Sequence, residues 1–181
     1  QVVFTGSEQR RTVTVKDGDK TLTPGSEFSV SYTDNTNAGT ATVTITGQGE
    51  YSGTTTKTFI IKPKPLTEDM VFLSSTSYTY NTLQQKPTVT VSYQSFLTAN
   101  DYTLTNDGGI NHGDYDVVVI GRNNYTGVIT KQFTIKPLSI ETAKVVLYEM
   151  ASYVYDGTAK NPGVREVAIS STIVPTSSYT V

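Results

Sequence analysis

The sequence predicts an all-β protein made of tandem, small antiparallel β-sandwich modules of immunoglobulin-like type. Three observations support this class. Part of the chain repeats at an offset of 74 residues (133 − 59). Apolar and polar residues alternate in several short segments, which is the period of a half-buried strand. Thr, Ser, Gly, Asn, Val and Tyr dominate the composition, whereas Ala, Leu and Glu, which fill helices, are scarce.

The repeat defines the folding unit. Residues 59–63, FIIKP, match residues 133–137, FTIKP, and the same offset places Tyr51-Ser52-Gly53 on Tyr125-Thr126-Gly127. A further copy is indicated by Tyr153-Val154-Tyr155-Asp156-Gly157. The period exceeds the roughly 20 to 50 residues of solenoid repeats and suits a small autonomous β domain strung in an array.

The alignment divides the chain into three predicted modules. Module 1 comprises residues 1–63 and lacks its first strand, module 2 comprises residues 64–137 and is complete, and module 3 comprises residues 138–181 and lacks its second half. Pro63, Pro65 and Pro137 follow the final strands of modules 1 and 2. Proline cannot donate to a ladder and stiffens the chain, so we expect short, semi-rigid joints and neighbouring modules as partners.

The strands of module 1 follow from strict alternation. The side chains expected to share a face are Val13 with Val15, then Phe28, Val30 and Tyr32, then Ala41, Val43 and Ile45, and finally Phe59 with Ile61. Thr42, Thr44 and Thr46 are expected on the opposite, outer face. One polar face per strand predicts antiparallel sheets that pack on one side.

Two segments come closest to a helical pattern. They are residues 139–147, SIETAKVVL, and their counterpart 66–73, LTEDMVFL. We predict a short turn followed by a strand in both. Six or seven short strands per module favour two packed sheets. Because the Cys and Trp markers of immunoglobulin domains are missing, a β-grasp-like sheet with a minor helix near the module start remains the alternative.

Two sets of side chains raise questions about packing. Tyr78 with Tyr80, and Tyr153 with Tyr155, are spaced by two and are predicted to pack in the core. Val118 and Ile120 replace Thr44 and Thr46 on the presumed outer face, which suggests a contact with another module or a partner. Module 3 lacks partner strands after Val181, so residues 138–181 are expected to be strained, exposed at an edge, or completed by another chain.

Composition argues against several functional classes. Lys and Arg nearly balance Asp and Glu, for a formal net charge of −2, which argues against nucleic-acid partners. There is no cysteine, so thiol catalysis and thiolate metal sites are excluded. No apolar run is long enough to insert in a membrane, and we expect no cofactor, no metal and no catalytic residue in these modules.

The remaining candidates for chemistry are better explained by turns. His112, the single histidine, is predicted to lie in a hairpin turn rather than in a catalytic triad. The carboxylates and amides of Asp17, Asp19, Asp34, Asn35 and Asn37 offer oxygen ligands to calcium but lack the spacing of a calcium loop. Tyr51 and Tyr125 are expected to hydrogen-bond back to the backbone at a sheet corner, with sugar stacking as the alternative.

The motifs together resemble a known family. An aromatic-Asp-Gly motif at Tyr155-Asp156-Gly157, the segment from Gly39 to Gly47, the Tyr-x-Gly motif at residues 51–53 and 125–127, and Phe-x-Ile-x-Pro at residues 133–137 are similar to the tandem MBG or YDG-type repeats of bacterial surface proteins. The resemblance implies immunoglobulin-like stalk modules that are exported, attached to the cell surface and without enzymatic role.

The expected function is therefore that of a non-catalytic stalk or spacer of a bacterial cell-surface or secreted protein. Two alternatives remain. The modules could be adhesive and bind a host glycan or matrix protein weakly and multivalently. They could also be accessory modules of a carbohydrate-active enzyme. A spacer requires bland outer faces, whereas an adhesin requires exposed aromatic side chains.

Overall fold

The structure is a computed structural model that describes residues 2–148, 152–170 and 172–180. The described residues contain β-strands, turns and two short 3-10 helices, and no helix among them is long and apolar enough to cross a membrane. The chain forms two compact units, Gln1–Lys136 and Pro137–Val181. The first unit holds modules 1 and 2 and the second holds module 3; the division into three modules stays a prediction.

Module 1 is built on one four-stranded sheet. Its strands, in spatial order, are β1 (Val2–Val3), β6 (Thr54–Lys62), β5 (Gly39–Gly47) and β4 (Phe28–Thr33). Ala41 and Val43 are buried on the inner face of β5, as their alternation predicts. On the outer face, Thr42, Thr44 and Thr46 lie opposite Thr58, Thr56 and Thr54 of β6.

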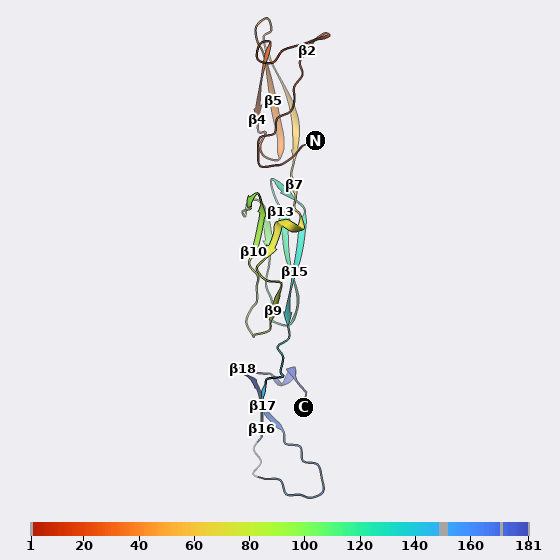
Figure 1. Ribbon diagram of the computed structural model, residues 1–181, viewed down its shortest axis with the longest axis vertical. Helices are drawn as coiled ribbons and strands as arrows, with labels where there is room; N and C mark the ends of the chain where they lie inside the picture. Colours follow the sequence, from red (N-terminus) through yellow and green to blue (C-terminus); the bar gives the residue numbers. More distant parts are fainter. Residues whose placement is uncertain (1, 149–151, 171, 181) are drawn as a thin grey trace. The chain divides into compact units, whose positions relative to one another are not determined.

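Module 2 contains two sheets. The larger one has the order β12 (Tyr102–Thr105), β13 (Gly113–Gly121), β15 (Val128–Lys136) and β9 (Ser77–Thr79). The smaller one has the order β11 (Ser95–Phe96), β10 (Val89–Tyr93) and β8 (Val71–Leu73). Figure 1 shows β13 and β15 as the long strands of this module, with β9 beside β15.

The two sheets of module 2 pack face to face. Val71 and Val91 of the smaller sheet belong to the same buried cluster as Val119 and Ile129 of the larger sheet. Two sheets closing on one core are a β-sandwich, so the predicted all-β sandwich class is confirmed. The β-grasp alternative needs a helix on the sheet, and the described part of module 2 has only the 3-10 turn η1 (Glu68–Met70) at that place.

The sheets are mainly antiparallel, as predicted, and three short pairs add parallel ladders. Three short strands pair in parallel: β1 with β6, β9 with β15, and β7 (Lys64–Pro65) with β14 (Tyr125–Thr126). Val2 lies opposite Ile61, and Tyr78 lies opposite Ile135. Each parallel pair joins segments that are distant along the chain, which alternation of side chains cannot reveal.

The predicted strand at Val13 and Val15 is wrong. Residues 11–15 belong to no ladder, and a small hairpin of β2 (Lys16–Asp17) and β3 (Lys20–Thr21) follows them. Their counterparts Val89 and Val91 form β10 by pairing with Leu73 and Val71 of β8. Among the described residues, no strand pairs with residues 11–15 in the way that β8 pairs with β10.

The second unit contains a three-stranded sheet. Its elements are β16 (Lys144–Leu147), β17 (Val164–Ile169), β18 (Thr172–Ile173) and the 3-10 turn η2 (Thr176–Ser178). The prediction of a turn and then a strand is confirmed here by β16 and in module 2 by η1 and β8.

The tyrosine pairs behave differently in modules 2 and 3. Tyr78 and Tyr80 pack against the buried cluster of Val117, Phe133 and Ile135, as predicted. Tyr153 and Tyr155 are 42% and 92% exposed, so the prediction of core packing is wrong for them. Tyr78 pairs with Ile135 of β15, whereas Tyr153 and Tyr155 lie in a stretch that forms no ladder with the described residues.

Candidate functional site: the junction between modules 1 and 2

The junction between modules 1 and 2 is one residue long. Strand β6 ends at Lys62 and β7 begins at Lys64, with Pro63 between them. The Lys64 amide donates to the carbonyl of Asn124 at 2.8 Å, and the Leu66 amide donates to that of Thr126 at 2.8 Å. The chain therefore leaves one sheet and enters a new ladder at once, with the φ angle of Pro63 restricted by its ring.

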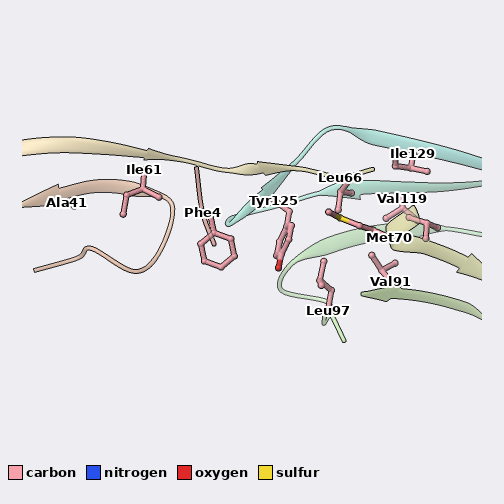
Figure 2. Packing of buried hydrophobic residues seen from close by; sticks show 11 residues of the cluster. Phe4, Ala41, Ile61, Leu66, Met70, Val91, Leu97, Val119, Tyr125 and Ile129 are labelled. Carbon is pink, nitrogen blue, oxygen red and sulfur yellow. The ribbon is translucent and has the colours of Figure 1, made fainter. Parts of the chain in front are cut away.

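One apolar cluster spans the junction. Phe4, Ala41 and Ile61 of module 1 are buried in the same cluster as Leu66 and Tyr125 of module 2. Figure 2 shows the rings of Phe4 and Tyr125 next to one another. Their centroids are 5.5 Å apart at an interplanar angle of 75°, the edge-to-face arrangement that aromatic quadrupoles favour.

Asn124 connects the modules by polar contacts. Its Oδ1 accepts a hydrogen bond from the amide of Ala38 at 2.7 Å, and its Nδ2 donates to Oδ1 of Asn37 at 3.0 Å. The first bond is partly buried. Sequence reasoning missed Asn124, because module 1 has Glu50 at the equivalent place and no local pattern marks a residue that bonds to another module.

A cation also lies at the junction. The ammonium of Lys64 is 4.2 Å from the centroid of the Tyr93 ring, which is within the range of a cation–π contact. Burial raises the pKa of the Tyr125 hydroxyl, and the charge of Asp101 adds to the increase. The junction thus combines apolar burial, directed hydrogen bonds and a cation–π contact.

The predicted role of Tyr51 and Tyr125 needs correction. The Tyr51 hydroxyl donates to the carboxylate of Asp17 at 3.2 Å rather than to the backbone, and Tyr125 contributes its ring to the apolar cluster. Bonds from tyrosine to a backbone carbonyl are instead made by Tyr32 to Arg11 and by Tyr115 to Asn111, the latter at 2.9 Å. Sequence spacing does not show which ring has a carbonyl within reach.

The Tyr51 end of module 1 carries a charged cluster. The Lys20 ammonium contacts Glu27 at 2.6 Å and lies 5.5 Å from the Tyr51 ring centroid. The hydrogen bond with Lys20 lowers the pKa of Glu27, and the same bond raises the pKa of Lys20. The Lys20 side chain is 60% exposed and the Glu27 side chain 22% exposed, so solvent screens the pair and we assign it little stabilising effect.

A cavity of about 430 Å³ lies beside this cluster. Its lining includes the apolar side chains of Val15, Leu22, Phe28 and Ile45, together with the ring of Tyr51. Asp17 and Glu27 add carboxylates to the same wall. An apolar cavity with a few polar groups at its rim can receive another segment of chain or a small ligand.

Module 2 exposes two phenylalanines on its smaller sheet. Phe72 of β8 is 53% exposed and pairs with Thr90, and Phe96 of β11 is 79% exposed and pairs with Ser92. Thr90 and Ser92 are two apart in β10, so all four residues share one sheet face. The face opposite the core therefore carries an aromatic pair that sequence analysis did not locate.

The outer face of the larger sheet is also partly apolar. Ile120 of β13 is 43% exposed, and its ladder partner Val128 is 58% exposed. Val118 is half-buried between the buried Val117 and Val119. The predicted outward position of Val118 and Ile120 is confirmed, and the contact suggested for them stays a prediction.

Of His112 and the possible calcium ligands, some side chains lie apart from the junction cluster, His112 among them, and others have hydrogen-bond partners within the chain. His112 is exposed in the bend before β13, as predicted. Asn35 is buried and donates from Nδ2 to the Gln9 carbonyl at 3.0 Å, and Asn37 accepts from Asn124. Within the described ranges no three His, Asp or Glu side chains gather as a metal site would require.

Comparison with known families matches part of the chain. The family model described as MBG domain matches residues 70–139. These residues form an MBG-type module. The MBG-type module includes β8 to β15, hence both sheets of the sandwich, and MBG domains are non-catalytic modules. A search of curated proteins and a search of solved structures found no match.

Proposed function

We propose that the chain is a non-catalytic tandem-repeat spacer of a bacterial cell-surface or secreted protein. The MBG-type module supports a surface role. The observation that carries the proposal is the junction, where a single proline separates two ladders and one apolar cluster includes residues of both modules. A spacer needs joints that transmit orientation, and buried contacts across a one-residue linker supply this property.

Repeated backbone geometry supports the tandem arrangement. Strands β5 and β6 have the same bounds as β13 and β15 when 74 is added (39 + 74 = 113, 62 + 74 = 136). The Gly47 amide donates to Gly53 at 2.9 Å, and the Gly121 amide donates to Gly127 at 2.9 Å. The same local structure is thus built twice from related sequences.

A distance measurement tests the spacer. The sequence has no cysteine, so Thr56→Cys and Thr130→Cys, both at exposed strand positions, introduce a unique pair of spin labels. We expect a single narrow distance distribution between the labels. Phe4→Ala combined with Asn124→Ala should broaden it, whereas Val3→Ala, at an exposed neighbour, should not. A broad distribution in the otherwise unaltered chain would contradict a spacer with a defined joint.

A second function is favoured by the aromatic face of module 2. We propose that Phe72 and Phe96, if the module is adhesive, form the contact surface for a glycan or a matrix protein. Exposed rings on one rigid sheet face suit stacking against apolar faces of sugars or anchoring in a protein pocket. Single sites of this kind are weak, and a tandem array would strengthen them by multivalency.

Binding of the chain, presented multivalently to glycans and matrix proteins, with and without calcium, separates the two functions. Saturable binding that is lost in Phe72→Ser with Phe96→Ser would establish adhesion. The matched control is Leu83→Ser, which changes a 66% exposed apolar residue outside that sheet. If the folded chain bound none of the glycans and matrix proteins, the result would favour the spacer function.

A further inference from the structure

Strand β12 leaves one side of its backbone without a partner. It lies at an edge of the larger sheet of module 2, and among the described residues only β13 pairs with it. The Arg122 amide donates to the Asp101 carbonyl at 2.7 Å at the start of this ladder. Bonded pairs alternate in an antiparallel ladder, so Thr103 is the next residue that bonds to β13. The amides and carbonyls of Tyr102 and Leu104 therefore point outward from the sheet.

This edge lacks the features that usually keep an edge strand from pairing. Such strands commonly carry a charge, a proline or a bulge. Strand β12 consists of Tyr-Thr-Leu-Thr, runs in continuous register with residues 118–121, and faces no charged ladder partner. Leu104 lies opposite the fully buried Val119 and is nevertheless 42% exposed. An apolar side chain is thus open to solvent at the rim of the core.

The equivalent edge of module 1 is guarded by a cation. Strand β4 also lies at the edge of its sheet. The hydroxyl of Tyr32 in β4 donates to the Arg11 carbonyl, and the Arg10 guanidinium lies 5.9 Å from the centroid of the same ring. Two copies that paired at β4 would bring these like charges together. In module 2 the place of Tyr32 is taken by Asn106, which offers no ring to a cation.

We propose that strands β12 of two copies of the chain pair antiparallel about a two-fold axis at Thr103. In this register Tyr102 of each copy lies opposite Leu104 of the other. Each of these two opposed pairs uses outward amides and carbonyls and exchanges two backbone hydrogen bonds. The larger sheets of the two MBG-type modules then form one continuous sheet, which is strand addition between copies.

The register is self-complementary, which favours a second copy of the chain as the partner. Tyr102 packs against the apolar cluster of its own module, so its ring is held on the core face of the sheet. There it would cover the exposed Leu104 of the other copy, and aromatic-aliphatic cross-strand pairs stabilise antiparallel sheets. On the outer face Thr103 meets its own copy, and Asp101 lies opposite Thr105. No like charges are opposed.

Pairing of this kind closes with two copies. The same edge of both chains is used, so the contact is isologous and no free β12 edge remains to add a third copy. It joins two chains side by side, whereas the junction between modules 1 and 2 acts along one chain. The inference goes beyond the spacer function, because it concerns contact between chains and holds whether or not the internal joint is rigid.

Sedimentation velocity and hydrogen exchange of the full chain over a range of concentrations test the proposal. We expect monomer and dimer in reversible equilibrium, without larger species. The amides of Tyr102 and Leu104 should become protected as the dimer forms. Those of Val30 and Tyr32, at the equivalent outward positions of β4, should exchange at the same rate throughout. A chain that stays monomeric at all concentrations, or protection that rises at Val30 and not at Leu104, would overturn the proposal.

A proline variant tests the backbone contact and leaves the sheet of the single chain intact. Leu104→Pro removes an amide that β13 does not use, and proline is tolerated in edge strands at such positions. By symmetry the dimer loses two of its hydrogen bonds and should weaken by at least about 10-fold. The matched control is Val30→Pro in β4, which should dimerise like the unaltered chain. Circular dichroism verifies that both variants are folded.

A charge swap tests the two-fold axis with variants that keep the backbone unchanged. Thr103 is exposed, so Thr103→Lys and Thr103→Glu should both fold. Each places like charges opposite one another in the dimer and should dimerise weakly, whereas an equimolar mixture opposes Lys to Glu and should restore the dimer. Ser31→Lys, at an exposed position of β4, should dimerise like the unaltered chain. Undiminished association of Thr103→Lys, or a mixture that restores nothing, would contradict pairing at Thr103.

Discussion

The ring of Phe4 stands edge-on to the ring of Tyr125, with 5.5 Å between the centroids, although the two residues are 121 positions apart in the sequence (125 − 4). The contact follows from two hydrogen bonds on either side of Pro63. The Phe4 amide donates to the Lys62 carbonyl at 2.8 Å, and the Lys64 amide donates to the carbonyl of Asn124, the residue before Tyr125. Both rings are thus attached to the same three-residue stretch of backbone.

Replacing Phe4 by Ala should destabilise the first unit by about 3 to 5 kcal/mol, because a buried aromatic side chain is removed from a packed cluster. Urea unfolding of the full chain measures the change. A double-mutant cycle with Tyr125→Ala should give a coupling of about 0.5 to 1.5 kcal/mol for the ring pair. Additive effects of the two substitutions would show that the rings contribute separately.

Replacing Asn124 by Ala should cost about 1 to 3 kcal/mol, because the partly buried amide of Ala38 loses its acceptor. Unfolding and hydrogen exchange at Ala38 report the loss. Asn124→Asp keeps an acceptor for Ala38 but removes the donor to Asn37, so it should restore the protection of Ala38 in part. Equal exchange at Ala38 in all three proteins would contradict this role of Asn124.

Replacing Gly121 by Ala should destabilise module 2 by about 1 to 3 kcal/mol through overpacking. A Cβ atom at Gly121 would lie 2.6 Å from the Thr126 amide nitrogen, which is backbone and cannot move alone. The equivalent Gly47→Ala meets Ser52 nitrogen at 2.8 Å and should act alike in module 1. Thermal unfolding of both variants should be compared with that of Arg122→Ala. The Arg122 side chain is exposed, so this substitution should leave the stability nearly unchanged.

Alkaline pH should weaken the junction through Tyr125. Burial raises the pKa of its hydroxyl above the ordinary value of 10.0, so the folded state holds this proton more tightly than the unfolded state. The corresponding stability is fully present below 10.0 and is lost as pH rises through the folded pKa. Urea unfolding at increasing pH should show this loss, and Tyr125→Phe should reduce it. Tyr155→Phe, at a 92% exposed ring, should leave it unchanged.

Acid should release a turn in the second unit. The hydrogen bond from Lys160, followed by those from Thr158, lowers the pKa of Asp156 from 3.8 to about 2. The lowered pKa means that the turn contacts are present above pH 3.8 and are lost as pH falls through about 2. NMR titration of the Asp156 carboxyl measures the value directly. In Lys160→Ala the pKa of Asp156 should return toward 3.8. An unchanged pKa of Asp156 in this variant would show that Lys160 is not the main cause of the shift.

Alternation of side chains predicted the strands whose partners lie nearby. Ala41 and Val43 are buried and Thr42 and Thr44 point the other way, because successive side chains of a strand face opposite sides whatever the partner strand is. The same rule failed at Val13 and Val15, which have the pattern of a strand but no ladder. A strand also needs a backbone partner, and alternation contains no information about whether one is present.

Local periodicity and motifs that recur at a fixed offset were enough to predict the repeat, the all-β class, the alternating faces of the strands and the likeness to MBG modules. The folded structure was needed to show that Asn124 bonds to Ala38, that Phe72 and Phe96 share an exposed face, and that a cavity lies beside Tyr51. These features depend on which distant segments meet and on which space is left unfilled. Pairing and packing between distant segments are properties of the folded chain, and no local pattern encodes them.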